Sequence, residues 1–284
     1  MQLEFAGRLT VADGRYLARD GGPDGAQRVL VMETLGAPPP PGRRRRKPRA
    51  ADIDDRPALP LARITAIRAF EPYDAEAGAE GWLEQVMETD ESLDAAVAEG
   101  VSLLNRALHA QSAAAADPYT PELTAERAVA VRIGYGSGEQ VAAGRFTLAH
   151  DVDVWASGAS KRQQRAEDLH PQERMAAILG QREQVDACEP LLLRARADLD
   201  AGRVREAALQ LRVGLEALLV ELAGALVDPG HEKDMAELEA RRQEAGNAAN
   251  AALRSDLNPE AERSVRELTE ISERVLRRRR VLRG

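Results

Sequence analysis

The segment Gly134–Gly138, Gly-Tyr-Gly-Ser-Gly, has the composition best suited to binding chemistry. Glycines allow backbone N–H groups to approach a phosphate closely, and Ser137 with Gln140 fits a capping box that opens a helix. Two flanking arginines could add positive charge. The pattern predicts a candidate ligand site formed by Arg132, Gly134, Gly136, Ser137, Gly138 and Arg145.

The same segment departs from the two common phosphate-binding motifs. In G-x-G-x-x-G the third glycine would fall on Glu139, and a P-loop needs a Lys followed by Ser or Thr. A tight turn without a ligand is therefore the alternative interpretation. Residues 139–155 fit either a strand pair or a strand-to-helix turn, and the sequence does not decide between them.

Two basic runs are candidates for binding a polyanion such as nucleic acid, because clustered cations neutralise phosphates. The first run lies in a proline-rich stretch and the second at the end of an expected helix, where cations also complement the carbonyl end without any ligand. Neither run contains an aromatic residue that could stack on a base. The candidate polyanion-binding residues are Arg43, Arg44, Arg45, Arg46 and Lys47, with Arg277, Arg278, Arg279 and Arg280.

The overall charge limits this interpretation. A net charge of −8 argues against a surface devoted as a whole to nucleic acid. Only three of the 39 basic residues are lysine, which is typical of a protein encoded in a GC-rich bacterial genome. The excess of arginine is therefore not by itself evidence for a ligand, and we expect at most weak binding of nucleic acid or another polyanion.

The remaining reactive side chains do not form a recognised site. Cys188 is the only cysteine, which excludes an internal disulfide and a cysteine-based zinc site, and we expect it to be a small buried residue. The histidines at 109, 150 and 231 lack metal-binding spacing. We therefore expect no metal and no cofactor. Arg165 and His170 have the R-x4-H spacing found in HEPN ribonucleases, but His170 directly precedes Pro171 in a polar segment, whereas in that family the pair lies on a core helix.

The N-terminal residues predict a small antiparallel β-unit. Residues 2–11 alternate between apolar and polar, and Asp13-Gly14 is a typical hairpin turn leading to a second strand over 16–19. A third strand over 28–35 completes a meander, and a fourth over 63–70 returns to the same sheet. Residues 37–61 between them are rich in proline and arginine, and we expect them to be a disordered loop.

Helical periodicity dominates after residue 72. Apolar residues recur every three or four positions over 82–87, 93–108 and 175–185, in two stretches over 189–226, and again over 235–252 and 265–275. Asn258 followed by Pro259 predicts the start of the last helix. Aromatic residues make up only 3% of the chain, which favours a helical core of Leu, Val and Ala.

The densest apolar run, 189–226, predicts a helical hairpin with a turn at Ala201-Gly202-Arg203. Through the sequence AGRVREAALQLRVGLEAL this hairpin resembles a single tetratricopeptide repeat, since it has a glycine between the helices and an alanine in the second helix where that family has them. The first helix lacks the family's aromatic residue, and no second copy occurs at the family's period. We therefore expect a helical hairpin within another fold, because an array needs about three repeats to bury its faces.

These observations predict an α+β protein with a β-unit over 1–72 and a mainly helical domain over 73–284, the latter containing a short β and glycine-loop segment over 128–150. No signal peptide is apparent, and we expect a cytoplasmic bacterial protein without a membrane segment. The favoured function is non-catalytic interaction or scaffolding with a protein partner, with homo-oligomerisation through the C-terminal helices as an option. Polyanion binding is the second hypothesis, and an enzyme or nucleotide binder using the glycine segment is the third.

Overall fold

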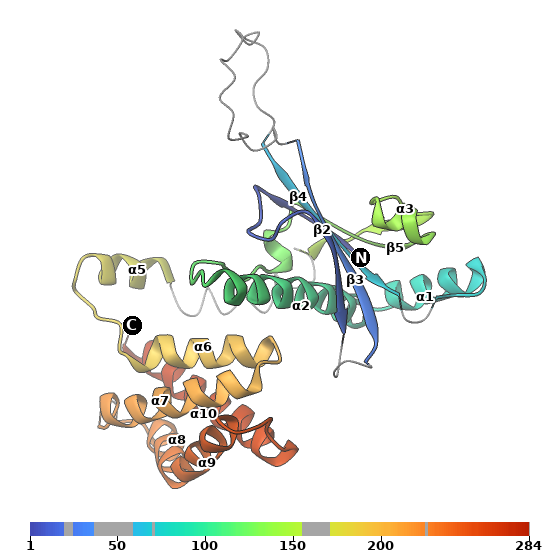
Figure 1. The fold of residues 1–284 in the computed structure, drawn as a ribbon. Helices are drawn as coiled ribbons and strands as arrows, with labels where there is room; N and C mark the ends of the chain where they lie inside the picture. The colour runs from blue at the N-terminus through green and yellow to red at the C-terminus, as the bar shows by residue number, and fades with distance from the viewer. Residues whose placement is uncertain (20–24, 37–58, 70–71, 155–170, 225–226, 284) are drawn as a thin grey trace. The chain divides into compact units, whose positions relative to one another are not determined.

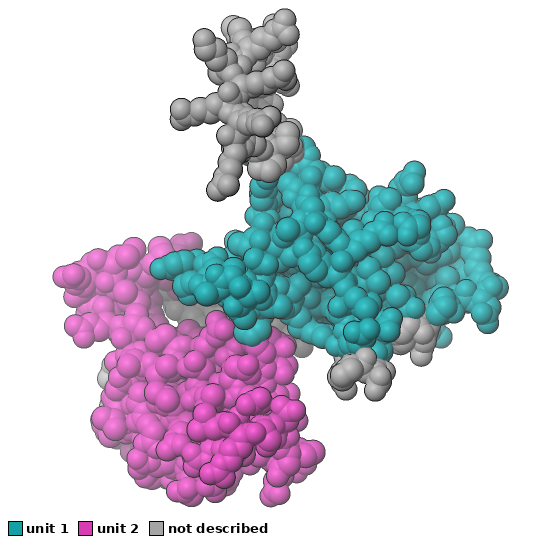
Figure 2. Space-filling view, viewed as in Figure 1, with its two compact units in different colours: residues 1–159 teal, residues 160–284 magenta. Residues whose placement is uncertain are grey.

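A computed structural model describes residues 1–19, 25–36, 59–69, 72–154, 171–224 and 227–283 (Figure 1). Its contacts divide the chain into two compact units, residues 1–159 and 160–284, which are coloured separately in Figure 2. Each unit is described by itself below. The chain is α+β, as the sequence predicts: an antiparallel sheet is followed by a mainly helical region.

The N-terminal unit is built on a six-stranded antiparallel sheet with the order β2-β3-β4-β1-β5-β6. The predicted strands over 16–19, 28–35 and 63–70 are present within two residues of their expected bounds, whereas the first strand ends at Ala6 instead of residue 11. β5 and β6 come from the expected β and glycine-loop segment and join the same sheet. The strands are β1 (Gln2–Ala6), β2 (Gly14–Arg19), β3 (Gln27–Leu35), β4 (Leu61–Arg68), β5 (Ala130–Tyr135) and β6 (Leu148–Asp151).

The expected hairpin between β1 and β2 is wrong. β1 lies in the middle of the sheet, where Leu3 pairs with Ile64 of β4 and with Val131 of β5, while β2 pairs only with β3 at the edge. Burial explains the arrangement: three of the five side chains of β1 are buried, on both faces, whereas β2 has no fully buried residue. The Asp13-Gly14 turn thus leads from the centre of the sheet to its edge.

One face of this sheet is apolar and packs against a long helix. Leu3 and Phe5 of β1 and Ile64 of β4 form a buried cluster with Leu104 and Leu108 of helix α2 (Asp90–Ala115). Helix α1 (Glu76–Met87) precedes α2, and a 3₁₀ turn, η1 (Ala125–Arg127), follows it (Figure 1). Fully burying each such side chain stabilises the unit by roughly 1.5–3 kcal/mol, so this face holds helix and sheet together.

The opposite face carries polar side chains. Arg63 of β4 forms an ion pair with Glu4 of β1, with 3.0 Å between Nε and Oε1, and Gln2 and Thr65 are buried there. This division follows from strand alternation, because neighbouring residues of a strand point to opposite faces.

The division at residue 159 differs from the boundary after residue 72 that we expected. The cause is long-range pairing: β5 joins β1, and α2 packs on the strands that precede it. The first two helices and the glycine segment therefore belong to the same compact unit as the sheet.

The C-terminal unit consists of helices. The apolar stretches predict all of them, except that the region 235–252 contains two helices separated at Arg241 where one was expected. The helices are α5 (Pro171–Leu179), α6 (Cys188–Asp200), α7 (Val204–Glu221), α8 (Pro229–Ala240), α9 (Arg242–Ala252) and α10 (Pro259–Arg283).

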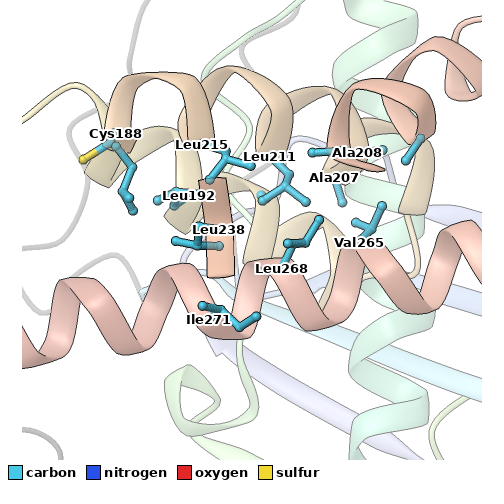
Figure 3. Close-up of a cluster of buried hydrophobic side chains, with 14 of the residues drawn as sticks. Cys188, Leu192, Ala207, Ala208, Leu211, Leu215, Leu238, Val265, Leu268 and Ile271 are labelled. Atoms are coloured by element: carbon cyan, nitrogen blue, oxygen red, sulfur yellow. The ribbon is translucent and has the colours of Figure 1, made fainter. Parts of the chain in front are cut away.

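Helices α6 and α7 form the predicted hairpin, with Gly202 at a φ of +73° in the turn between them. Leu211, Leu215 and Leu218 of α7 are buried, as their spacing predicts. Figure 3 shows side chains of the hairpin meeting Leu238 of α8 and Leu268 of α10. The hairpin thus packs into a single helical core rather than into an array of repeats.

The helix ends are held by specific side chains. Glu221 at the end of α7 accepts hydrogen bonds from the backbone N–H groups of Ala187 and Cys188, at 3.0 and 2.9 Å, and so caps α6. Asp228 caps α8 and Asn258 caps α10, the latter as predicted. Such caps satisfy backbone donors that a helix leaves without partners.

The helices that the structure describes do not include one with both the length and the apolar character needed to cross a membrane.

We expect Leu215→Ala to lower the free energy of unfolding of the C-terminal unit by about 2–5 kcal/mol, because the side chain is 1% exposed in a packed core. Urea unfolding followed by far-ultraviolet circular dichroism measures this change. Val220→Ala on the same helix is the control, since Val220 is 78% exposed and its truncation should change the free energy by less than about 0.5 kcal/mol. Equal midpoints for the two variants would contradict the packing.

Candidate ligand-binding cavity

A cavity of about 680 Å³ lies in the N-terminal unit, at the end of the sheet where β1 begins. Gln2 is the first residue of β1 and pairs with Thr65 of β4 and Arg132 of β5. Both neighbouring strands continue beyond it, β4 to Arg68 and β5 to Tyr135. They leave a notch that α1, α2 and the glycine segment also line. We call it the β1 cavity.

Aromatic and aliphatic side chains make up much of the wall of the β1 cavity. Tyr73, Trp82 and Tyr135 line it, together with Leu103 and other aliphatic residues of the sheet and helices. The chain has two Trp, four Tyr and three Phe, so a third of its aromatic residues meet at this one place. A wall of this kind suits an organic molecule with apolar surface.

The basic side of the β1 cavity is a cluster of Arg28 from β3, Arg68 from β4 and Glu99 from α2. Both arginines form ion pairs with the single carboxylate of Glu99. Arg28 and Arg68 come together because they are register partners in the sheet. The guanidinium of Arg68 also lies 6.0 Å from the centroid of the Trp82 ring. The two arginines therefore converge on one carboxylate at this side of the cavity.

The Tyr135 side of the β1 cavity is acidic. The hydroxyl of Tyr135 donates a hydrogen bond of 3.3 Å to Oε1 of Glu76 on α1. Partial burial, followed by the carboxylates of Glu76 and Glu80, raises the pKa of Tyr135. Its phenol is therefore protonated near neutral pH and can donate a hydrogen bond.

The amino group of Met1 also borders the β1 cavity and donates a hydrogen bond of 2.9 Å to the carbonyl of Ala66. Burial, and secondly the positive charge of Arg68, lower its pKa to about 5. At neutral pH this amine is uncharged in the folded protein. The positive charge at the cavity therefore comes from the arginines.

The predicted glycine segment lines the β1 cavity with Gly134, Gly136, Ser137 and Gly138. Two of these glycines also have a packing role. A Cβ at Gly134 would lie 2.3 Å from the carbonyl oxygen of Leu148, and one at Gly136 would lie 3.0 Å from the backbone nitrogen of Thr147. The absence of side chains therefore lets the chain pass close to β6 and the residues before it.

The structure answers the question left open for residues 139–155, because a strand-to-helix turn and a strand pair both occur there. A short helix, α3 (Gly138–Ala142), follows β5, and β6 then pairs with β5. Ser137 is the N-cap residue of α3, but its side chain makes no capping hydrogen bond, so the predicted capping box is wrong.

The two flanking arginines lie away from the β1 cavity. Arg132 alternates with Ile133 along β5 and points to the opposite face, where its Nε is 2.7 Å from Oδ1 of Asp151. Arg145 is exposed and is not among the residues that line the cavity. The structure therefore brings together four of the six residues of the predicted ligand site, without its two cations.

We expect Gly134→Ala to destabilise the N-terminal unit by roughly 1–3 kcal/mol, because the new methyl group would meet backbone atoms that cannot move without disturbing β5 and β6. Gly138→Ala is the matched control, since no atom lies within 4 Å of its added Cβ. Thermal unfolding of the two variants measures the difference. If both were equally stable, the packing role of Gly134 would be refuted.

The second arginine run lies within α10, and three of its members are occupied by carboxylates of the same unit. Arg278 pairs with Asp234, Arg279 with Asp186, and Arg280 with Glu189. Arg277 is exposed and forms no ion pair with the described residues. The first run, Arg43, Arg44, Arg45, Arg46 and Lys47, lies outside the described residues, as does most of the expected disordered loop 37–61.

Glu189 in the first turn of α6 shows why these pairs matter for folding. Its side chain is 5% exposed and receives hydrogen bonds from Arg174 and Arg280. Burial alone would raise the pKa of Glu189, but the two arginines hold it below its usual value. Removing one partner of a buried charge leaves the other poorly compensated. This geometry favours a structural role for the C-terminal end of the run.

We expect Arg280→Gln to lower the free energy of unfolding by about 1–3 kcal/mol, because Glu189 then loses a charged hydrogen-bond donor. Arg277→Gln removes the same charge from an exposed position and should change it by less than about 0.5 kcal/mol. Urea unfolding of both variants at neutral pH tests the difference. Identical midpoints would show that the Arg280 pair contributes nothing to the fold.

The remaining candidates do not form a site. Cys188 is fully buried, as expected, and burial, followed by a hydrogen bond and the charge of Glu221, raises the pKa of its thiol to about 12. Arg165 and His170 lie outside the described residues. No cluster of three or more His, Cys, Asp or Glu residues suited to a metal ion occurs in the part of the chain that the structure describes.

Arg28, Arg68, Trp82 and Glu99 are the residues that sequence reasoning missed. In the sequence Trp82 fits the apolar face of a helix, and Arg28 and Arg68 are single arginines within strands. Their proximity depends on the pairing of β3 with β4 and on the position of α2. The only local signal was the presence of a charged residue, Arg68, near the end of an apolar strand.

Comparisons with protein-family models, with curated proteins and with solved structures found no match for this chain. The resemblance of 189–226 to a tetratricopeptide repeat therefore has no support from these comparisons, and the function has to be argued from the β1 cavity.

Proposed function

We propose that this chain is a non-catalytic binding protein whose N-terminal unit holds a small organic molecule in the β1 cavity. The observation that carries the proposal is the cavity itself. Its volume of about 680 Å³ lies within the range of roughly 300–1,000 Å³ that is typical of ligand sites.

The composition of the wall supports the same proposal. Ligand sites combine mostly apolar and aromatic walls with a few polar groups that fix orientation. The β1 cavity follows this pattern, with Trp82 and Leu103 as apolar surface and with Arg68 and the Tyr135 hydroxyl as polar groups. The expected role as an interaction protein is retained in this proposal, with a small molecule as the partner.

Binding without catalysis fits the described side chains better than an enzyme does. Ser137 is the hydroxyl of the glycine segment, but no histidine or cysteine is present among the described residues that line the β1 cavity. An activated serine is hydrogen-bonded to a base, and Ser137 makes no side-chain capping hydrogen bond and no side-chain hydrogen bond to a base among the described residues. Polyanion binding is less favoured, because Arg278, Arg279 and Arg280 are already paired with carboxylates.

Filling the β1 cavity tests the proposal. The probe is N-phenyl-1-naphthylamine, an uncharged fluorophore whose emission rises in apolar sites. We expect saturable binding to the full chain and at least tenfold weaker binding to Ala96→Trp, because Ala96 of α2 lines the cavity and an indole there would occupy it.

The matched control is Ala98→Trp, which places the same side chain on the same helix at an exposed position outside the cavity wall. This variant should bind the probe as the unaltered chain does. In a Trp155→Phe background Trp82 is the only tryptophan, so energy transfer from Trp82 to the probe would locate the bound molecule. Absence of saturable binding, or equal binding by both variants, would contradict the proposal.

A further inference from the structure

We propose that the ligand of the β1 cavity is a planar aromatic acid, a molecule with a fused or substituted aromatic ring and one anionic group. This inference rests on the proposed function and specifies the chemical class of the ligand. It follows from the half-exposed guanidinium of Arg68, from the donors of Arg68 that the described residues leave unused, and from the aromatic residues beside them.

The arginine cluster supplies the charge. Arg68 shares the carboxylate of Glu99 with Arg28, so this carboxylate does not serve Arg68 alone. The Arg68 side chain remains 49% exposed, whereas that of Glu99 is 28% exposed. The guanidinium of Arg68 is therefore more accessible than the carboxylate that partly neutralises it.

Arg68 also has donors available for a ligand. Its hydrogen bonds to Glu99 use Nε and Nη2, and within the described residues Nη1 makes no hydrogen bond. A guanidinium has five N–H donors in a planar array that matches the oxygens of a carboxylate, sulfonate or phosphate. The Nη1 group can therefore bind an anion without breaking the existing ion pairs.

The positive charge of Arg68 acts on another group that borders the cavity. It contributes to lowering the pKa of the buried Met1 amine, which disfavours a second cation at this place. Because opposite charges attract, the positive charge of Arg68 favours an anion in the cavity. The acidic residue on the other side, Glu76, is exposed and keeps its negative charge, but it lies beside Tyr135 and forms no ion pair with Arg68 in the part of the chain that the structure describes.

Aromatic residues next to this charge define the rest of the ligand. Trp82 lies beneath Arg68, and Tyr73 and Tyr135 complete the set of aromatic side chains lining the cavity. Aromatic rings pair with other rings and with guanidinium groups through their faces and edges. An aliphatic acid would pair only with the guanidinium of Arg68. An aromatic acid would pair with this guanidinium and would also place its ring against the aromatic side chains of the wall.

Two probes that differ by one anionic group test the inference. 8-Anilino-1-naphthalenesulfonate has the ring system of N-phenyl-1-naphthylamine plus a sulfonate. We expect the sulfonate probe to bind the full chain at least tenfold more tightly than the uncharged probe at low salt, and this advantage to shrink as salt is added.

Variants of the cluster should change this advantage in opposite directions. Arg68→Gln should weaken binding of the sulfonate probe about tenfold and leave the uncharged probe within twofold. Glu99→Gln should tighten binding of the sulfonate probe severalfold, because it removes the carboxylate that competes for both arginines. The control is Arg15→Gln, which breaks an exposed pair with Glu139 outside the cavity wall and should alter neither probe.

The possible results separate the two proposals. If neither probe binds the full chain, both the proposed binding function and the proposed ligand class are refuted. If both probes bind with equal affinity and Arg68→Gln changes neither, the cavity binds small molecules but the aromatic-acid inference is overturned. If Arg68→Gln weakens both probes equally, Arg68 serves the fold rather than anion recognition, which also overturns the inference.

Discussion

The N-terminal unit depends on the pairing of β1 with β4 on one side and with β5 on the other. Leu3 and Phe5 point from this central strand into the core against α2. Without β1 the sheet would separate into the β2-β3-β4 part and the β5-β6 part. The same pairing contributes to the β1 cavity, because β4 and β5 both extend past Gln2, the first residue of β1. Side chains of the sheet and of neighbouring elements line the space between them, and no strand occupies it. Stability and the candidate site therefore have one structural cause.

The helices could be predicted closely from the sequence because their determinants are local. Leu211, Leu215 and Leu218 repeat at helical spacing, and Asn258 followed by Pro259 marks the start of α10. A helix satisfies its hydrogen bonds within its own segment, so a short window of sequence contains the necessary information. The break at Arg241 was missed because it involves no proline or glycine.

The sheet order and the cavity could not be predicted, since they depend on residues far apart in sequence. Leu3 alternates with polar residues as in either an edge or a central strand, and nothing near it identifies Val131 as its partner. Arg68 and Glu99 meet only after β4 and α2 are in place. The glycine segment was recognised as unusual, but the close backbone approach at Gly134 is a property of strand pairing that composition does not reveal.

The register of β1 has a consequence for folding during synthesis. Gln2 emerges from the ribosome about 130 residues before its partner Arg132. At about 5–20 residues per second, the strand waits on the order of ten seconds for β5. β4 and α2 are made earlier, so Leu3 and Phe5 can gain part of their packing before β5 is available. Helices α6 and α7, by contrast, are neighbours in sequence and can pair as soon as both have been made. The strand at the centre of the sheet therefore stays incompletely paired in the nascent chain for longer than either helix of this hairpin.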